Sequence, residues 1–361
     1  VDWRTFEGEV PAWDALAREA SEPNPFFESW YLLPSLRVFD PQGRVGLLRF
    51  DAGGRLAGLM PIARPSRYYR WPIPNLSSWL HDNALLGAPL VARGHEHAFW
   101  QALLGWADRR AGKALFLHLA HLPLDGPLHA ALVETLEAQH RRWGQVMAEE
   151  RALLASPLSP DAYLEQAMTG KKRKELRRQF ARLSELGTVA WERETDAEGL
   201  DAWCDAFLAL EASGWKGRAG SALACDPATA TLLRESLAGA AARGRLERLA
   251  LTLDGRPIAM LATFVSPPGA FSFKTAFDEG YARFSPGVLL QRENLALLER
   301  TDLTWTDSCA AADHPMIDHI WRERRPIGRL SIAIGGRLRR ALFSRLLAAE
   351  LSRQNPAGPQ A

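Results

Sequence analysis

Apolar residues form two pairs of β-rich runs, and an Asp-Gly or Asp-Ala-Gly-Gly turn separates the members of each pair. The first pair lies within residues 44–63 and turns at Asp51, and the second lies within residues 245–265 and turns at Asp254. A turn of this composition between apolar runs is a strong signal for a β-hairpin. The pattern therefore predicts one hairpin in each half of the chain.

The elements after each hairpin are also alike. In the second half the pattern predicts a strand, a helix and a strand over residues 270–277, 286–300 and 303–309. In the first half the same order is predicted over residues 85–91, 95–110 and 114–119. The repeated order indicates an internal duplication. Each half is expected to be an α/β domain, with helices flanking a mixed, mostly antiparallel sheet.

Helical periodicity places the remaining elements. Leu200, Trp203, Phe207 and Leu210 recur at spacings of three and four, and a second helix over residues 228–244 stops at Gly244. Residues 156–166 read as a linker followed by a helix start. These signals divide the chain into domains over residues 1–155 and 156–335, with a basic helix and tail over residues 336–361.

The tail is predicted to be a basic amphipathic helix. Leu338, Leu342, Phe343 and Leu346 share one face, Leu347 and Leu351 lie near it, and arginines occupy the rest. Such a helix can lie on an anionic membrane surface. It can also dock on its own domain or on a second copy of the chain, and docking is the favoured alternative.

Composition and charge narrow the class of protein. The chain of 361 residues is 47% hydrophobic and 24% charged, with a formal net charge of +2, as in an ordinary globular protein of two domains. Its three cysteines, Cys204, Cys225 and Cys309, form no CxxC pair, which favours a reducing compartment. No apolar run of 18 residues and no signal-peptide pattern is present, so a soluble cytoplasmic protein is expected, and its oligomeric state is left open.

A resemblance to a known family rests on three motifs in order. They are a basic segment with Lys172, Arg173, Arg177 and Arg178; a hairpin with Gly255, Pro257, Ile258 and Ala259; and Tyr281 followed by Ser285, Pro286, Gly287, Leu289 and Leu290. This order resembles the CelD/BcsL branch of the GNAT acyltransferase superfamily, which is related to the FemABX peptidyltransferases. The resemblance covers most of residues 159–329. It implies two tandem GNAT-like domains, an acyl-thioester donor and an amine acceptor.

The segment Ser285-Pro286-Gly287 has the chemistry of an anion-binding helix start. Ser285 can cap the helix, Pro286 fits its first turn, and Gly287 lets a ligand approach the backbone. GNAT proteins use a Q/R-x-x-G-x-G/A run for the CoA pyrophosphate, and at this helix start a single glycine, Gly287, stands in its place. The donor therefore stays open between acyl-CoA, held by Ser285, Gly287, Val288 and Lys274, and the aminoacyl-tRNA used by Fem-like relatives.

Acyl transfer to an amine also needs acid and base groups. Tyr281 is the candidate acid for the leaving thiolate, because a phenol has a proton to give. Asp278 and Asp307 are candidate bases or orienting groups, and Glu211 is a further candidate base at the mouth of the site. Strand alternation puts Lys274 on the same face as Asp278.

Two further segments are candidates for the acceptor site. Residues 213–223 place Trp215, Lys216 and Arg218 in a glycine-rich loop suited to a phosphate, carboxylate or sugar. His314 is a candidate substrate-binding residue or proton carrier. Asp313, His314, Asp318 and His319 fit no standard zinc pattern, and no metal is expected.

The sequence therefore predicts an N-acyltransferase that moves an acyl group from acyl-CoA to an amine. Family context suggests an amino sugar of an exopolysaccharide or cell envelope, or a lipid amine, as the acceptor. One alternative is a Fem-like transferase that uses charged tRNA, since the basic helix over residues 171–182 could bind a phosphate-bearing partner. Another is a catalytically inactive partner of a polysaccharide synthesis machine.

Overall fold

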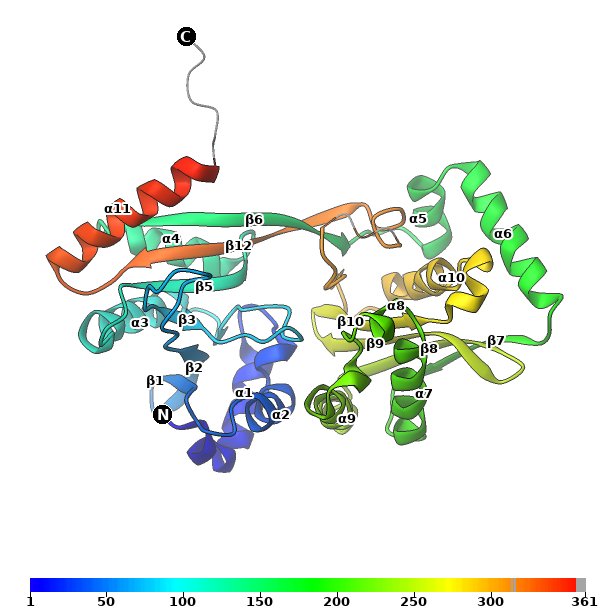
Figure 1. Cartoon of the computed structure of the whole chain (residues 1–361), viewed down its shortest axis with the longest axis horizontal. Helices are drawn as coiled ribbons and strands as arrows, with labels where there is room; N and C mark the ends of the chain where they lie inside the picture. Colours follow the sequence, from blue (N-terminus) through cyan, green and yellow to red (C-terminus); the bar gives the residue numbers. More distant parts are fainter. Residues whose placement is uncertain (313, 315, 355–361) are drawn as a thin grey trace, which may run out of the picture. The chain divides into compact units, whose positions relative to one another are not determined.

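The structure, a computed structural model, describes residues 1–312, 314 and 316–354 in two compact units (Figure 1). The first unit comprises Val1–Glu150 and the chain from Pro326 onward, and the second comprises Arg151–Arg325. Strands β6 (Trp143–Leu154) and β12 (Glu323–Ala333) carry the chain across these boundaries. The sequence-based division assigned residues 326–335 to the second domain and treated the last helix separately. The structure groups both with the first unit, because β12 pairs there with β5.

The sheet of the first unit has the strand order β1-β2-β3-β5-β12-β6, with β4 also paired to β2. The pairs β1–β2, β2–β3, β2–β4 and β5–β12 are antiparallel, whereas β3 and β5 run parallel. The strands are β1 (Gly46–Ala52), β2 (Arg55–Ala63), β3 (Leu76–Ser78), β4 (Leu90–Val91) and β5 (Phe116–Pro123). The helices are α1 (Val10–Glu19), α2 (Ser29–Phe39), α3 (Glu96–Arg110), α4 (Pro127–Ala138) and α11 (Arg337–Gln354), with 3-10 turns at Trp3–Glu9 and Pro25–Phe27.

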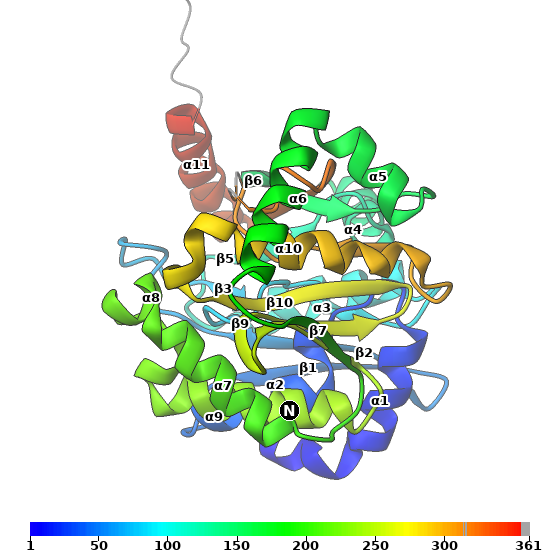
Figure 2. The same cartoon turned by 90° about the vertical axis from the view of Figure 1, so that its right-hand side faces the viewer.

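The sheet of the second unit has the order β11-β10-β9-β8-β7, and the end of β6 pairs with β11. Helices α5, α6 and α10 lie on one side of β7–β10 and helices α7 and α9 on the other (Figure 2). The strands are β7 (Val189–Glu194), β8 (Leu246–Leu253), β9 (Arg256–Ser266), β10 (Gly269–Phe277) and β11 (Trp305–Asp307). The helices are α5 (Pro160–Ala167), α6 (Gly170–Ser184), α7 (Leu200–Ser213), α8 (Trp215–Arg218), α9 (Pro227–Ala241) and α10 (Pro286–Glu293), with 3-10 segments η3 (Leu223–Cys225), η4 (Glu279–Phe284) and η5 (Asn294–Glu299).

Both units contain the same sequence of elements. A hairpin (β1-β2 or β8-β9) is followed by an antiparallel third strand (β3 or β10), a crossover helix (α3 or α10) and a parallel strand (β5 or β11). The strand predicted over residues 85–91 is wrong in extent, because only Leu90–Val91 form a strand there, and the third strand of the first unit is β3, which the pattern did not predict. Both hairpins turn where the sequence predicted, and at the second turn Asp254 and Gly255 have positive φ of 50° and 76°. The predicted fold class, a mixed and mostly antiparallel sheet flanked by helices, is confirmed.

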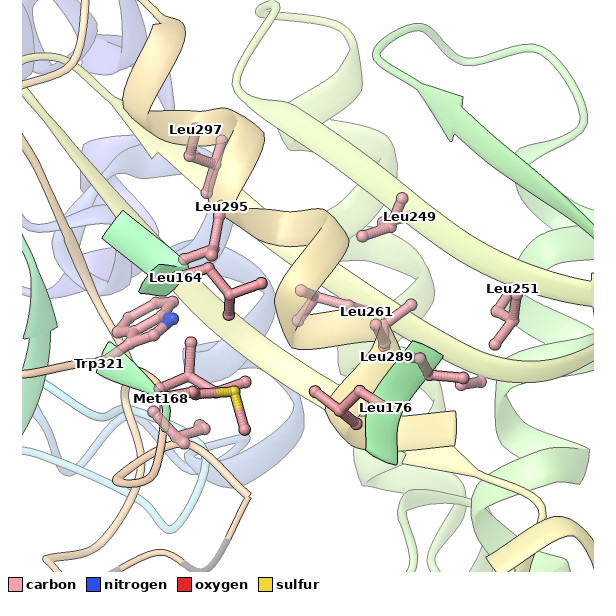
Figure 3. Close-up of a cluster of buried hydrophobic side chains, with 14 of the residues drawn as sticks. Leu164, Met168, Leu176, Leu249, Leu251, Leu261, Leu289, Leu295, Leu297 and Trp321 are labelled. Carbon is pink, nitrogen blue, oxygen red and sulfur yellow. The ribbon is translucent and has the colours of Figure 1, made fainter. Parts of the chain in front are cut away.

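The main core of the second unit lies between its sheet and α10 (Figure 3). Leu249, Leu251 and Leu261 of β8 and β9 face Leu289 of α10, and Trp321 closes one end of the cluster. Alternate residues of a strand point to the same face, which is why Leu249 and Leu251 of β8 both face α10. Burial of each large side chain contributes about 1.5–3 kcal/mol, so α10 is held firmly on the sheet.

Helix α11 packs on the first unit through only part of the predicted apolar face. Phe343 and Leu347 are buried, and the Phe343 ring stacks on Phe116 at 5.4 Å. Leu338 and Leu342 are 90% and 57% exposed, so the shared apolar face expected from the sequence is split between core and solvent. Within the described residues, the helices are all too short or too polar to cross a membrane.

Candidate functional site

The parallel strands β10 and β11 separate after a short contact. They pair only at Gly269–Trp305, Ala270–Thr306 and Phe271–Asp307, and β10 then continues to Phe277. A β-bulge at Phe273 follows the last paired residue, and β9 stays paired along the other edge of β10. Bulges bend a strand and interrupt its ladder. In the described part of the chain, the edge of β10 beyond Phe271 has no strand beside it, and this gap is called the β10–β11 opening below.

The turn after β10 holds two of the predicted catalytic residues. Asp278 caps η4, because its Oδ1 accepts the Gly280 N–H at 2.9 Å, and its Oδ2 lies 3.2 Å from an Arg256 nitrogen. Tyr281 is half-buried against the core of the second unit. Its hydroxyl has no hydrogen-bond partner among the described residues. Asp278 therefore stabilises the turn, whereas the Tyr281 hydroxyl makes no hydrogen bond within the described residues and can bond to a ligand.

Helix α10 starts at an unusual residue. Ser285 has φ 54° and ψ 50°, a left-handed conformation that costs a residue with a side chain about 1–3 kcal/mol. Its side chain makes no capping hydrogen bond, so the predicted cap is wrong, since the left-handed backbone differs from the extended backbone of an N-cap that bonds through its side chain. Pro286 occupies the first turn, as predicted, and brings no N–H.

Gly287 leaves a backbone donor at the start of α10. The N–H groups of Val288 and Leu289 both bond to the Ser285 carbonyl, whereas the Gly287 N–H has no partner among the described residues. A Cβ at Gly287 would lie 2.5 Å from the Met316 sulfur, so a thioether covers this glycine. Val288 itself is partly buried against the core. The helix start can take an anion only where Met316 moves aside.

The glycine-rich loop contains a short helix that the sequence did not predict, α8, which holds Trp215 and Arg218, and it closes onto the turn after β10. Glu279 accepts the Trp215 N–H at 2.7 Å and bonds Arg218 at 2.7 Å, and these two bonds lower its pKa. The sequence analysis missed Glu279, although an acid beside Asp278 and a cationic loop elsewhere were a usable signal. The structure therefore brings the two segments predicted to bind donor and acceptor together.

A buried ion pair holds the base of the same loop. Glu211 accepts Lys216 Nζ at 2.7 Å through one oxygen and the Leu223 N–H at 2.8 Å through the other. Glu211 is buried, and both of its oxygens are used in closing the loop. This placement favours a positioning role for Glu211 and Lys216.

His314 lies within electrostatic reach of Lys216. Burial lowers its pKa below the ordinary value of 6.5; the Asp318 carboxylate opposes this shift and the Lys216 charge adds to it. Its Nδ1 is buried and has no hydrogen-bond partner in the described part of the chain. Burial and the Lys216 charge thus favour the neutral imidazole, which is the form able to accept a proton.

Asp307 and Lys274 flank the β10–β11 opening. Asp307 is fully buried between two arginines, 3.6 Å from Arg151 and 3.3 Å from Arg325, and also accepts the Cys309 N–H at 2.8 Å. A carboxylate held by two guanidinium groups and an amide is a structural anchor of β11. Lys274 extends over the Phe273 ring, with its nitrogen 5.4 Å from the ring centre.

Comparison with known protein families gives one match. Residues 170–314 match the family model described as "Acetyltransferase (GNAT) domain". The second unit carries a GNAT-type acetyltransferase domain. A comparison with curated protein sequences gives no match. The metal-binding group considered for residues 313–319 includes Asp313, which lies outside the described residues, and no cluster able to hold a metal occurs among the described ones.

Solved structures resemble the chain over most of its length. The crystal structure of FemX covers 89% of this chain and 95% of its own, with a TM-score of 0.57 and 10% identity. The C-terminal domain (DUF2156) of a putative lysylphosphatidylglycerol synthetase from Agrobacterium fabrum covers 96% of both chains, with a TM-score of 0.55 and 13% identity. A conserved protein of unknown function from Bacteroides thetaiotaomicron covers 90% of this chain and 97% of its own, with a TM-score of 0.56 and 12% identity. At these identities the likeness is one of fold.

The GNAT domain holds two buried amides that sequence reasoning missed. Gln291 and Asn294 are fully buried, and the polar atoms of both side chains have no hydrogen-bond partner among the described residues. Each unsatisfied buried group costs about 1–3 kcal/mol. Gln291 follows Gly287 by four residues on the same face of α10, and Asn294, which begins η5, follows Gln291 by three. The signal in the sequence was a pair of amides within an otherwise leucine-rich segment.

Proposed function

We propose that this protein is an N-acyltransferase whose GNAT domain takes an acyl-CoA and passes the acyl group to an amine. The observation that carries the proposal is the β10–β11 opening, where β10 runs on from Phe271 without a strand at that edge. An extended ligand with amide groups can bond to such an edge as an added strand would. The pantetheine arm of CoA is a ligand of this kind.

The start of α10 would receive the pyrophosphate of the donor. It lies at the end of the turn that follows β10, and the Gly287 N–H supplies a donor that no described residue bonds. Helix N-termini favour anions because their amide groups and dipole point at the ligand. Gly287 has no Cβ, so displacement of Met316 is enough to expose the backbone there. Val288 and Lys274 complete the donor site in this proposal.

The proposed chemistry uses one base and one acid. The amine nitrogen attacks the thioester carbonyl carbon, the C–N bond forms, and the C–S bond breaks. His314 accepts the proton that the amine loses, since burial keeps its imidazole neutral. Tyr281 gives its phenol proton to the leaving thiolate. Asp278, Glu211 and Asp307 position the surrounding segments, because their oxygens already accept hydrogen bonds or face arginines.

The acceptor is placed at the glycine-rich loop. Trp215 is exposed there and offers a flat apolar face, and Arg218, which is exposed and pairs with Glu279, adds a cation that suits a phosphate or carboxylate on the acceptor. An amino sugar of the envelope or a lipid amine has the required amine and, in many cases, an anionic group. The CelD/BcsL relationship, which motivated this choice from the sequence, stays a prediction.

A thermal-shift series with CoA, acetyl-CoA and palmitoyl-CoA tests the donor. Tight binding to the folded state raises Tm by mass action, because a ligand at 100 Kd adds about 2.7 kcal/mol to the free energy of unfolding. We expect one acyl-CoA to raise Tm and Gly287→Leu to abolish the shift. The same series in Gly105→Leu, which changes a glycine of the crossover helix α3 in the first unit, serves as the matched control.

The competing function is a transferase that uses charged tRNA. It is favoured by the exposed cationic face of α6, which carries Lys171, Lys172, Lys174, Arg177, Arg178 and Arg182. Binding through phosphates weakens steeply with salt. Absence of any acyl-CoA shift together with salt-sensitive tRNA binding would replace the proposed donor. Absence of both would indicate an inactive binding partner.

A further inference from the structure

A cavity of about 530 Å³ lies within the first unit, between a tight turn after β2 and helix α11. It is far from the GNAT domain in sequence and uses none of that domain's residues. Its volume is within the range of small-molecule sites, about 300–1,000 Å³. The wall from the turn comprises Tyr68, Tyr69, Arg70, Trp71 and Ile73, and the wall from α11 comprises Leu346, Ala349, Glu350 and Arg353.

The turn presents two aromatic rings to solvent. Tyr68 and Trp71 exchange backbone hydrogen bonds of 2.9 and 3.0 Å, which close a two-residue turn around Tyr69 and Arg70. Tyr69 is 58% exposed and Trp71 is 46% exposed. Tyr69 also has φ 50°, which is rare for a bulky residue and costs conformational energy. Strain that exposes apolar rings beside a cavity is a feature of ligand sites.

The back wall of the cavity is rigid. The Tyr68 hydroxyl donates to Glu350 at 2.8 Å and its ring packs edge-on against Phe116 at 4.9 Å. Phe343 and Leu347 fix α11 one turn away, in the same small core. The cavity is therefore built by folded elements on both sides.

The charges at the cavity favour an anion. Arg70 and Arg353 lie on opposite walls, and only Glu350 opposes them among the lining residues. Glu350 already accepts Tyr68, and burial raises its pKa. The Arg70 guanidinium lies over the Trp71 ring, 5.2 Å from its centre. A cationic ligand therefore cannot bind to that face of the ring. A cationic ligand would meet two arginines, whereas an anionic group would be paired.

The rest of the cavity favours a hydrocarbon. The other lining residues are aromatic or aliphatic, and they offer few groups that could bond to the hydroxyls of a sugar. On α11, the exposed Leu342 precedes Leu346 by four residues and extends the apolar strip along the helix. Burying a methylene group in such a strip contributes about 0.8 kcal/mol.

We propose that this cavity binds a single-chain amphiphile, with an apolar chain along α11 and a carboxylate or phosphate between Arg70 and Arg353. All lining residues of the cavity belong to the first unit, so the proposed site is independent of the acyl-transfer proposal and is tested separately. It assigns the first unit a binding activity of its own.

Calorimetric titration with dodecyl phosphate, below its micelle-forming concentration, tests the site. We expect saturable binding to the full chain, and at least a tenfold loss of affinity in Ala349→Trp, which fills the cavity from an exposed helical position. Ala348→Trp makes the same change at the neighbouring exposed position, which does not line the cavity, and should bind normally. Equal binding by the two variants would overturn the proposal.

The charge requirement is tested by double reversal, Arg70→Glu with Arg353→Glu. Dodecyl phosphate affinity should fall about tenfold or more, and dodecyltrimethylammonium, which the native protein should bind poorly, should now bind. Dodecyl maltoside and butyl phosphate, which lack the charge and the chain respectively, should bind weakly to both proteins. Comparable affinity of the native chain for the phosphate and the ammonium would contradict the role of the arginines. Sedimentation with phosphatidylglycerol vesicles, without binding of free dodecyl phosphate, would assign this surface to membranes instead and reject the cavity.

Discussion

The two units differ where the parallel strands on either side of the crossover helix separate. In the described residues this strand edge is open in the second unit, whereas the chain itself covers it in the first. In the second unit β10 extends past β11 with no strand at that edge in the described part of the chain. In the first unit the chain contacts the equivalent edge of β5 at Ser78 and again at Gly87. Ser78 Oγ accepts the Ala120 N–H at 2.9 Å, and the Gly87 N–H donates to the His121 carbonyl at 2.9 Å.

The difference shows that the connecting segments, rather than the frame of strands, decide where a ligand can enter. In the first unit the chain after β3 turns back across β5, and Gly87 comes so close that a Cβ would lie 2.0 Å from the Ala120 oxygen. In the second unit the chain after β10 turns directly into η4 and α10. The same order of elements is therefore found with an open strand edge in the second unit, where we propose that the donor binds, and with a covered one in the first.

The largest expected effect comes from blocking the proposed phosphate site at the start of α10 in the second unit. Gly287→Leu adds a side chain at the start of α10, where Met316 already lies against the glycine. We expect at least a thousandfold loss of kcat/KM with acyl-CoA, because the phosphate site and the reacting geometry are lost together. Steady-state kinetics on the folded variant measure it. Wild-type kcat/KM would show that the donor does not use this helix start.

The next largest effect is expected from removing the proposed acid, the Tyr281 hydroxyl, from the second unit. Tyr281→Phe removes only a hydroxyl and should lower kcat about 10²- to 10³-fold, with KM for the donor nearly unchanged. Tyr163→Phe is the matched control, because the Tyr163 hydroxyl is engaged by Glu323 at 2.7 Å and by the Arg322 N–H at 2.8 Å. That control should lower stability by about 1 kcal/mol and leave kcat intact. Equal kcat values in the two variants would remove Tyr281 from the mechanism.

The first unit should respond in stability alone. Gly87→Ala forces its methyl group against the Ala120 backbone, and overpacking of this kind costs about 1–3 kcal/mol. Tm should fall, while kcat and KM per folded molecule should stay unchanged. A raised donor KM would mean that the first unit also takes part in donor binding.

The smallest expected effect is a shift in pH dependence. Burial and the Lys216 charge both lower the pKa of His314, so the acid limb of kcat/KM should lie below pH 6.5. Lys216→Gln removes one positive neighbour and should move that limb to higher pH. His314→Gln should remove the limb altogether. An acid limb that neither variant changes would assign the base to another residue.

Local signals predicted much of the fold. The Asp-Gly turns, the crossover helices and the stop at Gly244, which has φ 63°, all depend on neighbouring residues and were found from the sequence. The assignment of β12 to the first unit was missed, because pairing between distant strands leaves no local pattern. The hydrophobic face of α11 was only half correct, since periodicity cannot show how much of a stripe a neighbouring element covers.

The candidate site was predicted as a set of residue types and not as an arrangement. The turn at Tyr281 and the loop at Trp215 were both singled out, but Glu279, which ties them together, is an ordinary surface acid by sequence. Asp307 looked like a base until its neighbours were known, because Arg151 and Arg325 are distant along the chain. Contacts between segments far apart in sequence decide which polar residue is available for chemistry.

The insertion of the second unit between β6 and β12 has a consequence during synthesis on the ribosome. Strand β12 lies between β5 and β6 in the first unit, yet it is made only after residues 151–325. At roughly 5–20 residues per second, the edge of β5 waits on the order of ten seconds or more for its partner. An unpaired strand edge invites pairing with other chains. We therefore expect the nascent first unit to depend on chaperones, while the second unit, whose sequence emerges without interruption, can fold ahead of it.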